Sequence, residues 1–185
     1  MNKKQQLQKC RDILYSKNIL PEDEQFLKEL IMLHPHSNIK IGIGIKCFEI
    51  KYNPYGQLGF HIIRKDNSKT DFSFYECISP KNKNTRICLA CRNTIKDLIK
   101  NTKKNKENII HHEKIYFNKL VKDWIKENPL IDLSLNPPKD NCYEIYFINP
   151  LTINSFYEYH LKNANLLELT PKEHKLKHKK EVGEE

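Results

Sequence analysis

The chain has 185 residues, enough for one ordinary domain or two small ones, and its apolar content of 38% and aromatic content of 10% exclude an intrinsically disordered protein. Its net charge of +9, from 32 Lys and Arg against 23 Asp and Glu, suits a polyanionic partner such as nucleic acid, although plain solubility explains it equally well. No apolar stretch is long enough to span a bilayer, and no apolar segment of a signal peptide follows the basic N-terminus.

We therefore expect a protein that is not secreted and has no membrane partner, cytoplasmic by default, or nuclear or organellar in a eukaryote. Its six cysteines are then expected to be reduced thiols. Cys88 and Cys91 form a CxxC pair, but a structural zinc site needs four ligands and the sequence holds no second pair. We expect both to pack in a core, and we expect the same of Cys47, Cys77 and Cys142.

The first hundred residues predict helices around a small antiparallel meander. Apolar residues at helical spacing predict a helix over residues 3–16, and Pro21 with the acids after it predicts a second helix that ends before Pro35. Alternating patterns predict strands over 39–45, 47–52, 58–65 and 70–78, with turns at 53–56 and 66–69. Gly42 and Gly44 inside the first strand indicate a bulge or a close backbone approach. Residues 86–100 return to a helical period.

A polar, basic run at 101–108 looks like a linker, so we expect one domain over residues 1–100 and a second over residues 101–185. The second should contain a strand at 109–113, a helix at 116–127 that buries Trp124, a loop at 129–142, and a strand at 143–148. A helix at 150–163, a strand at 166–169 and a final helix follow. Thr170 caps that helix, Pro171 takes its first position, and residues 181–185 should fray. The predicted fold class is α+β.

Four of the eight histidines stand out by their spacing. His174 and His178 are four residues apart on the last helix, so they face the same way and could share one metal ion. Adjacent residues on a strand point to opposite faces, so one member of the His111-His112 doublet could bind the metal while the other faces a water as general base. The alternative is that these are solvated surface histidines. His160, on the preceding helix, could approach the metal or a phosphate, but a partly buried polar role is favoured.

Together these residues resemble the motif of the HNH, or ββα-metal, nucleases: a His doublet on a strand, an Asn, a second strand, and a helix with one or two His. The closing part, Asn165-x8-His174-x3-His178 with Thr170-Pro171-Lys172 at the turn, is similar to the colicin-type DNases. Two inserted helices separate the halves here.

This resemblance implies a metal-dependent endonuclease that hydrolyses DNA, such as a restriction, phage or mobile-element enzyme. By position, His111, His174 and His178 would bind one divalent ion (Zn, Ni, Mn or Mg), His112 would be the general base, and Asn165 would orient the loop or the base. Imidazole ligands suit Zn, Ni, Co or Mn better than Mg. A symmetric double-strand cut would favour a homodimer.

A second resemblance covers residues 26–100, which look like the DCL-like ("defective chloroplasts and leaves") domain through Leu33-His34-Pro35, Lys40-Ile41-Gly42-Ile43-Gly44 and Phe60-His61-Ile62-Ile63-Arg64. It implies a nucleic-acid context and no chemistry. The region could be a recognition half, using basic positions at Lys40, Lys46, Lys51, Arg64 and Lys65, or a scaffold.

The alternative function is a non-catalytic RNA- or DNA-binding protein of this type, acting in RNA processing. DNA is the first expected partner and RNA the second. The expected phosphate contacts are Lys100, Lys103, Lys104, Lys106, Lys172 and Lys175.

Overall fold

The computed structural model describes residues 1–52, 56–139 and 144–182, and the side chains of its last helix only as far as residue 177. The protein is of the α+β class, with an antiparallel meander and several helices, as predicted. Its chain forms two compact units, unit 1 from Met1–Asn82 with Pro137–Tyr143 and unit 2 from Lys83–Asn136 with Glu144–Glu185. The first boundary between the units lies after Asn82, whereas the domain boundary predicted from the sequence lies after residue 100, at the start of the basic run.

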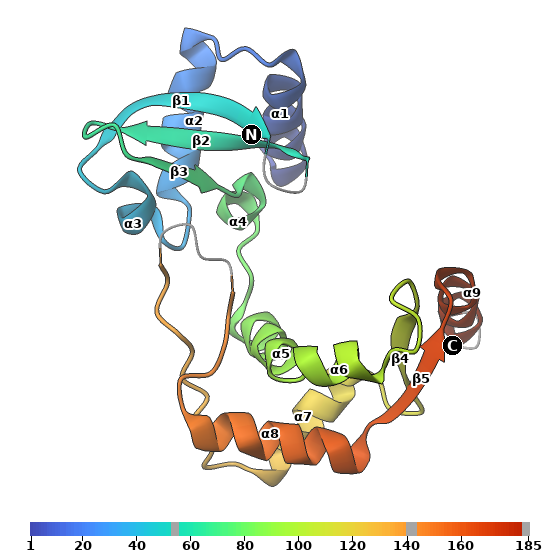
Figure 1. Ribbon diagram of the computed structural model, residues 1–185. Helices are drawn as coiled ribbons and strands as arrows, with labels where there is room; N and C mark the ends of the chain where they lie inside the picture. The colour runs from blue at the N-terminus through green and yellow to red at the C-terminus, as the bar shows by residue number, and fades with distance from the viewer. Residues whose placement is uncertain (53–55, 140–143, 183–185) are drawn as a thin grey trace. The chain divides into compact units, whose positions relative to one another are not determined.

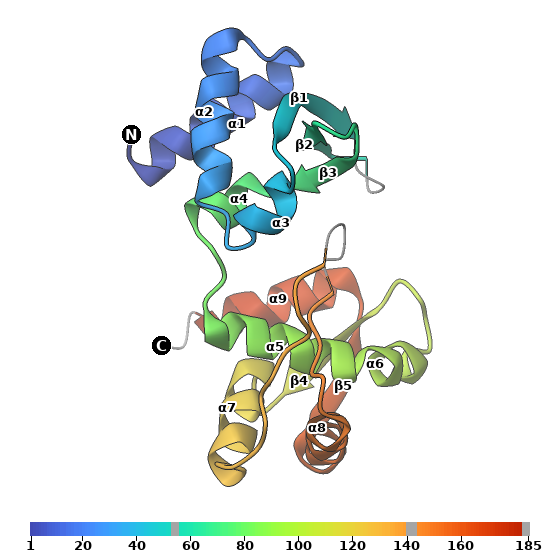
Figure 2. The same ribbon diagram turned by 90° about the vertical axis from the view of Figure 1, so that its left-hand side faces the viewer.

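Unit 1 packs its helices on a three-stranded sheet. Helices α1 (Lys3–Ser16) and α2 (Pro21–Met32) form as predicted, the first behind a capping box between Asn2 and Gln5 and the second with Pro21 in its first turn. Strands β1 (Ile45–Tyr52), β2 (Leu58–Arg64) and β3 (Lys69–Phe72) pair antiparallel in that order. Figure 2 shows α1 and α2 on one side of this sheet, and the core between them holds Leu27, Leu30, Ile31, Phe60 and Ile62.

Two predicted strands of unit 1 are wrong in part. Residues 39–44 of the strand predicted over 39–45 are instead the end of helix α3 (Ser37–Ile41) and a turn, in which Gly42 and Gly44 have φ of +54° and +117°, and only Ile45 is in a strand, as the first residue of β1. Five residues with alternating Ile fit one helical turn as well as a strand. The strand predicted at 70–78 ends at Phe72, because Ser73 accepts a hydrogen bond from the Glu76 N–H and caps helix α4 (Phe74–Ile78). Residues 53–55 of the predicted turn lie outside the described residues.

Unit 2 is built on four helices, α5 (Lys83–Thr94), α6 (Lys96–Thr102), α7 (Phe117–Glu127) and α8 (Pro150–Asn163). The helix predicted at 86–100 is therefore divided at Ile95. Trp124 is fully buried, as predicted, against the rings of Phe147 and Phe156, and its indole N–H donates to the Ser155 hydroxyl. The described cysteines are all free thiols, and Cys91 packs in this core with the half-buried Cys88 beside it. Cys142 lies outside the described residues.

The strand predicted at 143–148 is wrong over residues 144–148. This segment has one isolated bridge, between Leu135 and Phe147, and Asn136 supplies further bonds through its side chain to Glu144 and Tyr146. An alternating apolar pattern predicts burial, but a strand also needs a partner along its length.

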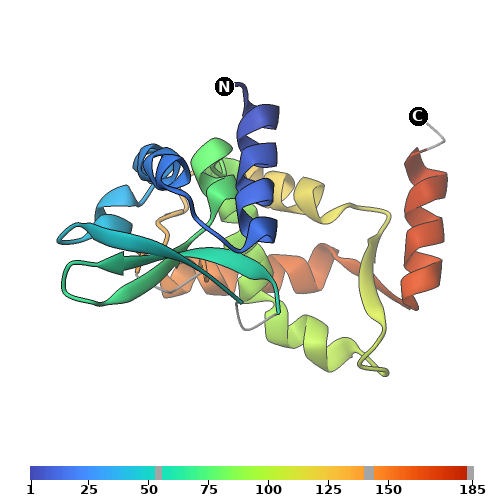
Figure 3. The ribbon, with the colours of Figure 1, turned by 90° about the horizontal axis from the view of Figure 1, so that it is seen from above.

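A hairpin and a helix complete unit 2. Strand β4 (Ile109–Glu113) pairs antiparallel with β5 (Asn165–Leu169), so that the chain closes across the long insertion that contains α7 and α8. Helix α9 (Pro171–Val182) follows at once, capped by Thr170, whose hydroxyl accepts from the Glu173 N–H while the Glu173 carboxylate accepts from the Thr170 N–H. Figures 1 and 3 both show α9 beside this hairpin. Within the described ranges no helix has the length and apolarity to cross a membrane.

Candidate functional site

The hairpin brings His111 to the last helix. His111 is 4% exposed in the middle of β4, opposite Leu167, and its ring lies 5.4 Å from the ring of His174, centroid to centroid, at an interplanar angle of 78°. Two imidazoles bound to one tetrahedral ion, with bonds of about 2.0–2.1 Å, place their ring centroids roughly 5 Å apart. The separation of these two rings therefore suits a shared ion.

A third ligand would have to come from further along α9. His178 is one turn beyond His174 in that helix, on the same face by its spacing, but its side chain lies outside the described residues. Among the side chains that the structure describes, no group of three or more His, Cys, Asp or Glu could hold a metal. The nearby carboxylate of Glu113 is paired with Lys177. The candidate donors are therefore imidazoles, a ligand type that suits Zn, Ni or Co better than Mg.

His112 faces the other side of the hairpin. Its Nε2 lies 2.9 Å from Nε2 of His160 on α8, and its ring packs edge-on against Phe117 at 5.1 Å. Burial, with smaller contributions from His160 and Arg92, lowers the pKa of His112 to about 4. The side chains of His111 and His112 point to opposite faces of the hairpin, as expected for neighbours in a strand. His112, however, contacts His160, where a water was expected from the sequence.

His160 is more deeply buried than the sequence suggested. It is 1% exposed, burial lowers its pKa, and its Nδ1 has no hydrogen-bond partner among the described residues. The signal in the sequence is its position four residues after Phe156 and eight after Thr152, both buried, which puts it on the buried stripe of α8. Asn165 begins β5 opposite Glu113 with an exposed side chain, which makes no hydrogen bond to the described residues.

The lysines expected to contact phosphate lie on the surface of unit 2. Lys103 is half-exposed, and the others are exposed: Lys100, Lys104, Lys106, Lys172 and Lys175. The loop that carries three of them is tied to β5, because Glu168 Oε1 accepts hydrogen bonds from the backbone N–H groups of Lys104 and Asn105, both at 2.9 Å, and from Asn108 Nδ2 at 3.0 Å. These backbone bonds lower the pKa of Glu168. The loop is therefore held by hydrogen bonds, unlike a free linker.

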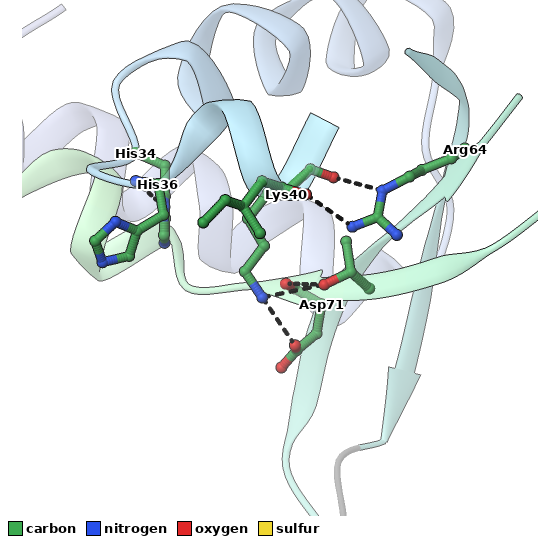
Figure 4. A network of polar contacts seen from close by, with 7 residues as sticks. His34, His36, Lys40, Arg64 and Asp71 are labelled. Atoms are coloured by element: carbon green, nitrogen blue, oxygen red, sulfur yellow. Dashed lines mark hydrogen bonds and ion pairs between the residues drawn. The ribbon is translucent and has the colours of Figure 1, made fainter. Parts of the chain in front are cut away.

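A buried polar network in unit 1 contains two of the expected basic surface positions (Figure 4). Arg64, 7% exposed, donates to the carbonyl groups of Ile39 and Lys40, both at 3.0 Å, and Lys40, 6% exposed, donates to the Thr70 hydroxyl at 3.0 Å and lies 3.7 Å from Asp71. Lys40 and Arg64 hold α3 against the sheet. Their burial corrects the expectation that they present charge to a nucleic acid.

Three comparisons with known proteins gave matches to parts of the chain. A family model described as "Protein of unknown function (DUF3223)" matches residues 12–78. DNA-directed RNA polymerase IV subunit 1 of Arabidopsis thaliana is 35% identical over 57 residues, which are 30% of this chain and 4% of that protein. The solution structure of an uncharacterized protein from Rhodospirillum rubrum is 31% identical, covering 41% of this chain and 77% of that chain, with a TM-score of 0.38. The resemblances to HNH nucleases and to the DCL-like domain stay predictions. The family match lies within unit 1 and ends before the histidine site begins.

Proposed function

We propose that the protein is a metal-dependent endonuclease that hydrolyses DNA phosphodiester bonds, with its site between the β4–β5 hairpin and α9. The observation that carries the proposal is the distance of 5.4 Å between the rings of His111 and His174, which come from distant parts of the chain. The order of strand, strand and helix around this pair supports the proposal, because it is the order of the nuclease motif that the sequence resembles.

In this proposal His111, His174 and His178 hold one divalent ion. A bound ion would offset the negative charge that develops on the phosphate and the leaving oxygen. The imidazoles must be neutral to bind it, so affinity should fall in acid. The exposed lysines would hold the backbone of the substrate without reading its sequence.

His112 is the proposed general base. Its lowered pKa keeps the ring neutral at pH 7, the form that accepts a proton, but a pKa of about 4 also makes it a weaker base than an ordinary histidine. Since Nε2 is engaged with His160, the accepting atom would be Nδ1, with Nε2–H donating to His160. If the His112→Ala variant cleaved DNA at the wild-type rate, His112 would not be the general base. That result would not bear on the proposed metal ligands.

Plasmid cleavage tests the proposal. Supercoiled DNA is incubated with the protein and Mn²⁺, Ni²⁺, Zn²⁺ or Mg²⁺, with and without chelator. We expect chelator-sensitive nicking that His174→Ala reduces by at least about 100-fold, the scale of losing an electrostatic stabiliser of the transition state. The matched control is His61→Ala, which removes a histidine from unit 1 and should cleave as the wild type does. A wild-type protein that nicks nothing with any of these ions would refute the proposal.

A second candidate is a protein that binds nucleic acid without cutting it. The similarity of 57 residues to an RNA polymerase subunit favours it, together with the charge of +9. This candidate predicts binding to DNA or RNA in chelator with no cleavage under any metal, and binding that His174→Ala leaves unchanged.

A further inference from the structure

A carboxylate organises the basic loop that precedes β4. Glu168 lies on β5 opposite Ile110, and one of its oxygens accepts three hydrogen bonds from residues 104–108. Two of the donors are consecutive backbone N–H groups, so the carboxylate fixes the path of the main chain as well as one side chain. Successive N–H groups directed at one point form a concave site for an anion, and here Glu168 fills it.

The anchored loop places charge at one end of the hairpin. At that end Ile109, the first residue of β4, pairs with Leu169, the last residue of β5. The loop therefore leads into β4 there, and α9 begins at Pro171, two residues after β5 ends. Two basic segments that are far apart in the sequence, one with Lys103, Lys104 and Lys106 and one with Lys172 and Lys175, thus adjoin the same end. His174 lies in the first turns of α9, between Lys172 and Lys175 in sequence.

Glu168 and Glu173, two of the acidic side chains at this end, are committed to other groups, whereas Glu107, within the loop itself, is exposed. Glu168 binds the loop, and Glu173 accepts from the N–H and hydroxyl of Thr170 at the start of α9. Glu113, at the other end of β4, is paired with Lys177. These three carboxylates are paired with groups of the protein itself. Four lysines of the two basic segments are exposed: Lys104, Lys106, Lys172 and Lys175.

We propose that Glu168 is a positioning residue for nucleic-acid binding, which holds Lys103, Lys104 and Lys106 in a preformed loop that contacts the phosphate backbone at the end of the hairpin where α9 begins. The inference rests on the proposed function for its partner, a nucleic acid, and needs no metal. A loop that is ordered before binding loses less conformational entropy when it binds. Because Glu168 orders this loop, an acidic residue is expected to increase the affinity for a polyanion.

A positioning role for Glu168 and simple electrostatics predict opposite effects of Glu168→Ala on binding. Glu168→Ala makes the protein more positive by one charge, so charge alone predicts tighter binding. Loss of the anchor predicts weaker binding, by about threefold to tenfold for the side chains that must then be ordered. Glu168→Gln removes the same charge and keeps an oxygen that can accept from the backbone N–H groups, so it should bind at least as tightly as the wild type.

The measurement is fluorescence anisotropy of a labelled 24-base-pair duplex in chelator, over a series of salt concentrations, with the full chain. Replacing Lys103, Lys104 and Lys106 together with Ala should lower the slope of log affinity against log salt by about 2–3, near 0.9 for each phosphate that the protein no longer neutralises. The matched control replaces the exposed Lys122, Lys126 and Lys162 with Ala, the same change of charge in the same unit. Its slope should stay within about 1 of the wild-type slope.

Binding by Glu168→Ala that equals or exceeds that of Glu168→Gln would overturn the proposal, as would equal salt slopes for the two triple variants. Thermal unfolding of each variant checks that unit 2 is folded, and if Glu168→Ala does not fold, the triple variants still decide whether the loop contacts phosphate. Because binding is measured in chelator, cleavage can fail while this inference stands. Absence of wild-type binding to the duplex and to a 24-base single strand would refute it.

Discussion

Replacing either histidine of the His112–His160 pair should destabilise unit 2, and replacing both should cost less than the sum of the two single replacements. The two Nε2 atoms lie 2.9 Å apart, and His160 is 1% exposed. In the His160→Leu variant, Nε2 of His112 loses its partner. In the His112→Leu variant, Nε2 of the buried His160 loses its partner. A buried polar group without its partner costs about 1–3 kcal/mol, whereas removal of both partners is close to neutral. The coupling energy of the double-mutant cycle should therefore be about 1–2 kcal/mol.

Urea unfolding followed by tryptophan fluorescence suits this measurement. Trp124 is the only tryptophan of the chain and is fully buried in unit 2, so its emission reports on that unit. The control cycle combines His160→Leu with His61→Leu, a histidine of unit 1, and its costs should add. Additive costs in the His112–His160 cycle, within about 0.5 kcal/mol, would show that the two rings do not stabilise each other and would refute the reasoning.

Two further predictions concern unit 1, both read from urea unfolding by circular dichroism. Burial lowers the pKa of His34 to about 4, so from pH 7 to pH 5 the unfolded chain takes up a proton that the folded protein does not, and stability should fall by about 2 kcal/mol. His34→Gln should remove this part of the acid dependence, and an unchanged dependence would contradict the assignment. Gly42→Ala should cost about 1–3 kcal/mol, because φ is +54° and a Cβ would lie 3.1 Å from Arg64 Cδ. Gly59→Ala, with no such contact, should change stability by less than about 1 kcal/mol, and equal effects of the two would count against the strain.

The sequence predicted the elements whose signals are local. Helices α1, α2, α8 and α9 each begin with a cap or a proline, α7 has an apolar stripe that ends before Pro129, and the β4 and β5 strands stand between clear breaks. Residues 39–41 of the strand predicted over 39–45 are helical instead, because their alternation fits both periods over so few residues. The choice between them depends on Arg64, whose guanidinium binds the carbonyl groups of residues 39 and 40 from another strand.

The candidate site was predicted only in part, for a similar reason. The spacing of the two histidine pairs anticipated that β4 and α9 lie together, and the rings of His111 and His174 do so. The partner of His112 depends on how α8 packs against the hairpin, which no local pattern specifies. The contacts of Glu168 are with backbone N–H groups some sixty residues away in the sequence. Because every residue except proline has such a group, the residue types do not indicate which ones Glu168 binds.

The proposed function requires that His111 and His174 hold one divalent ion between the hairpin and α9. A crystal of the full chain grown with Zn²⁺, with anomalous diffraction recorded on both sides of the zinc edge, would locate that ion. We expect one strong anomalous peak about 2.0–2.1 Å from a nitrogen of each ring, with His178 as a third ligand. Zinc bound elsewhere, or no peak between the two rings at saturating zinc, would show that His111 and His174 do not form a metal site.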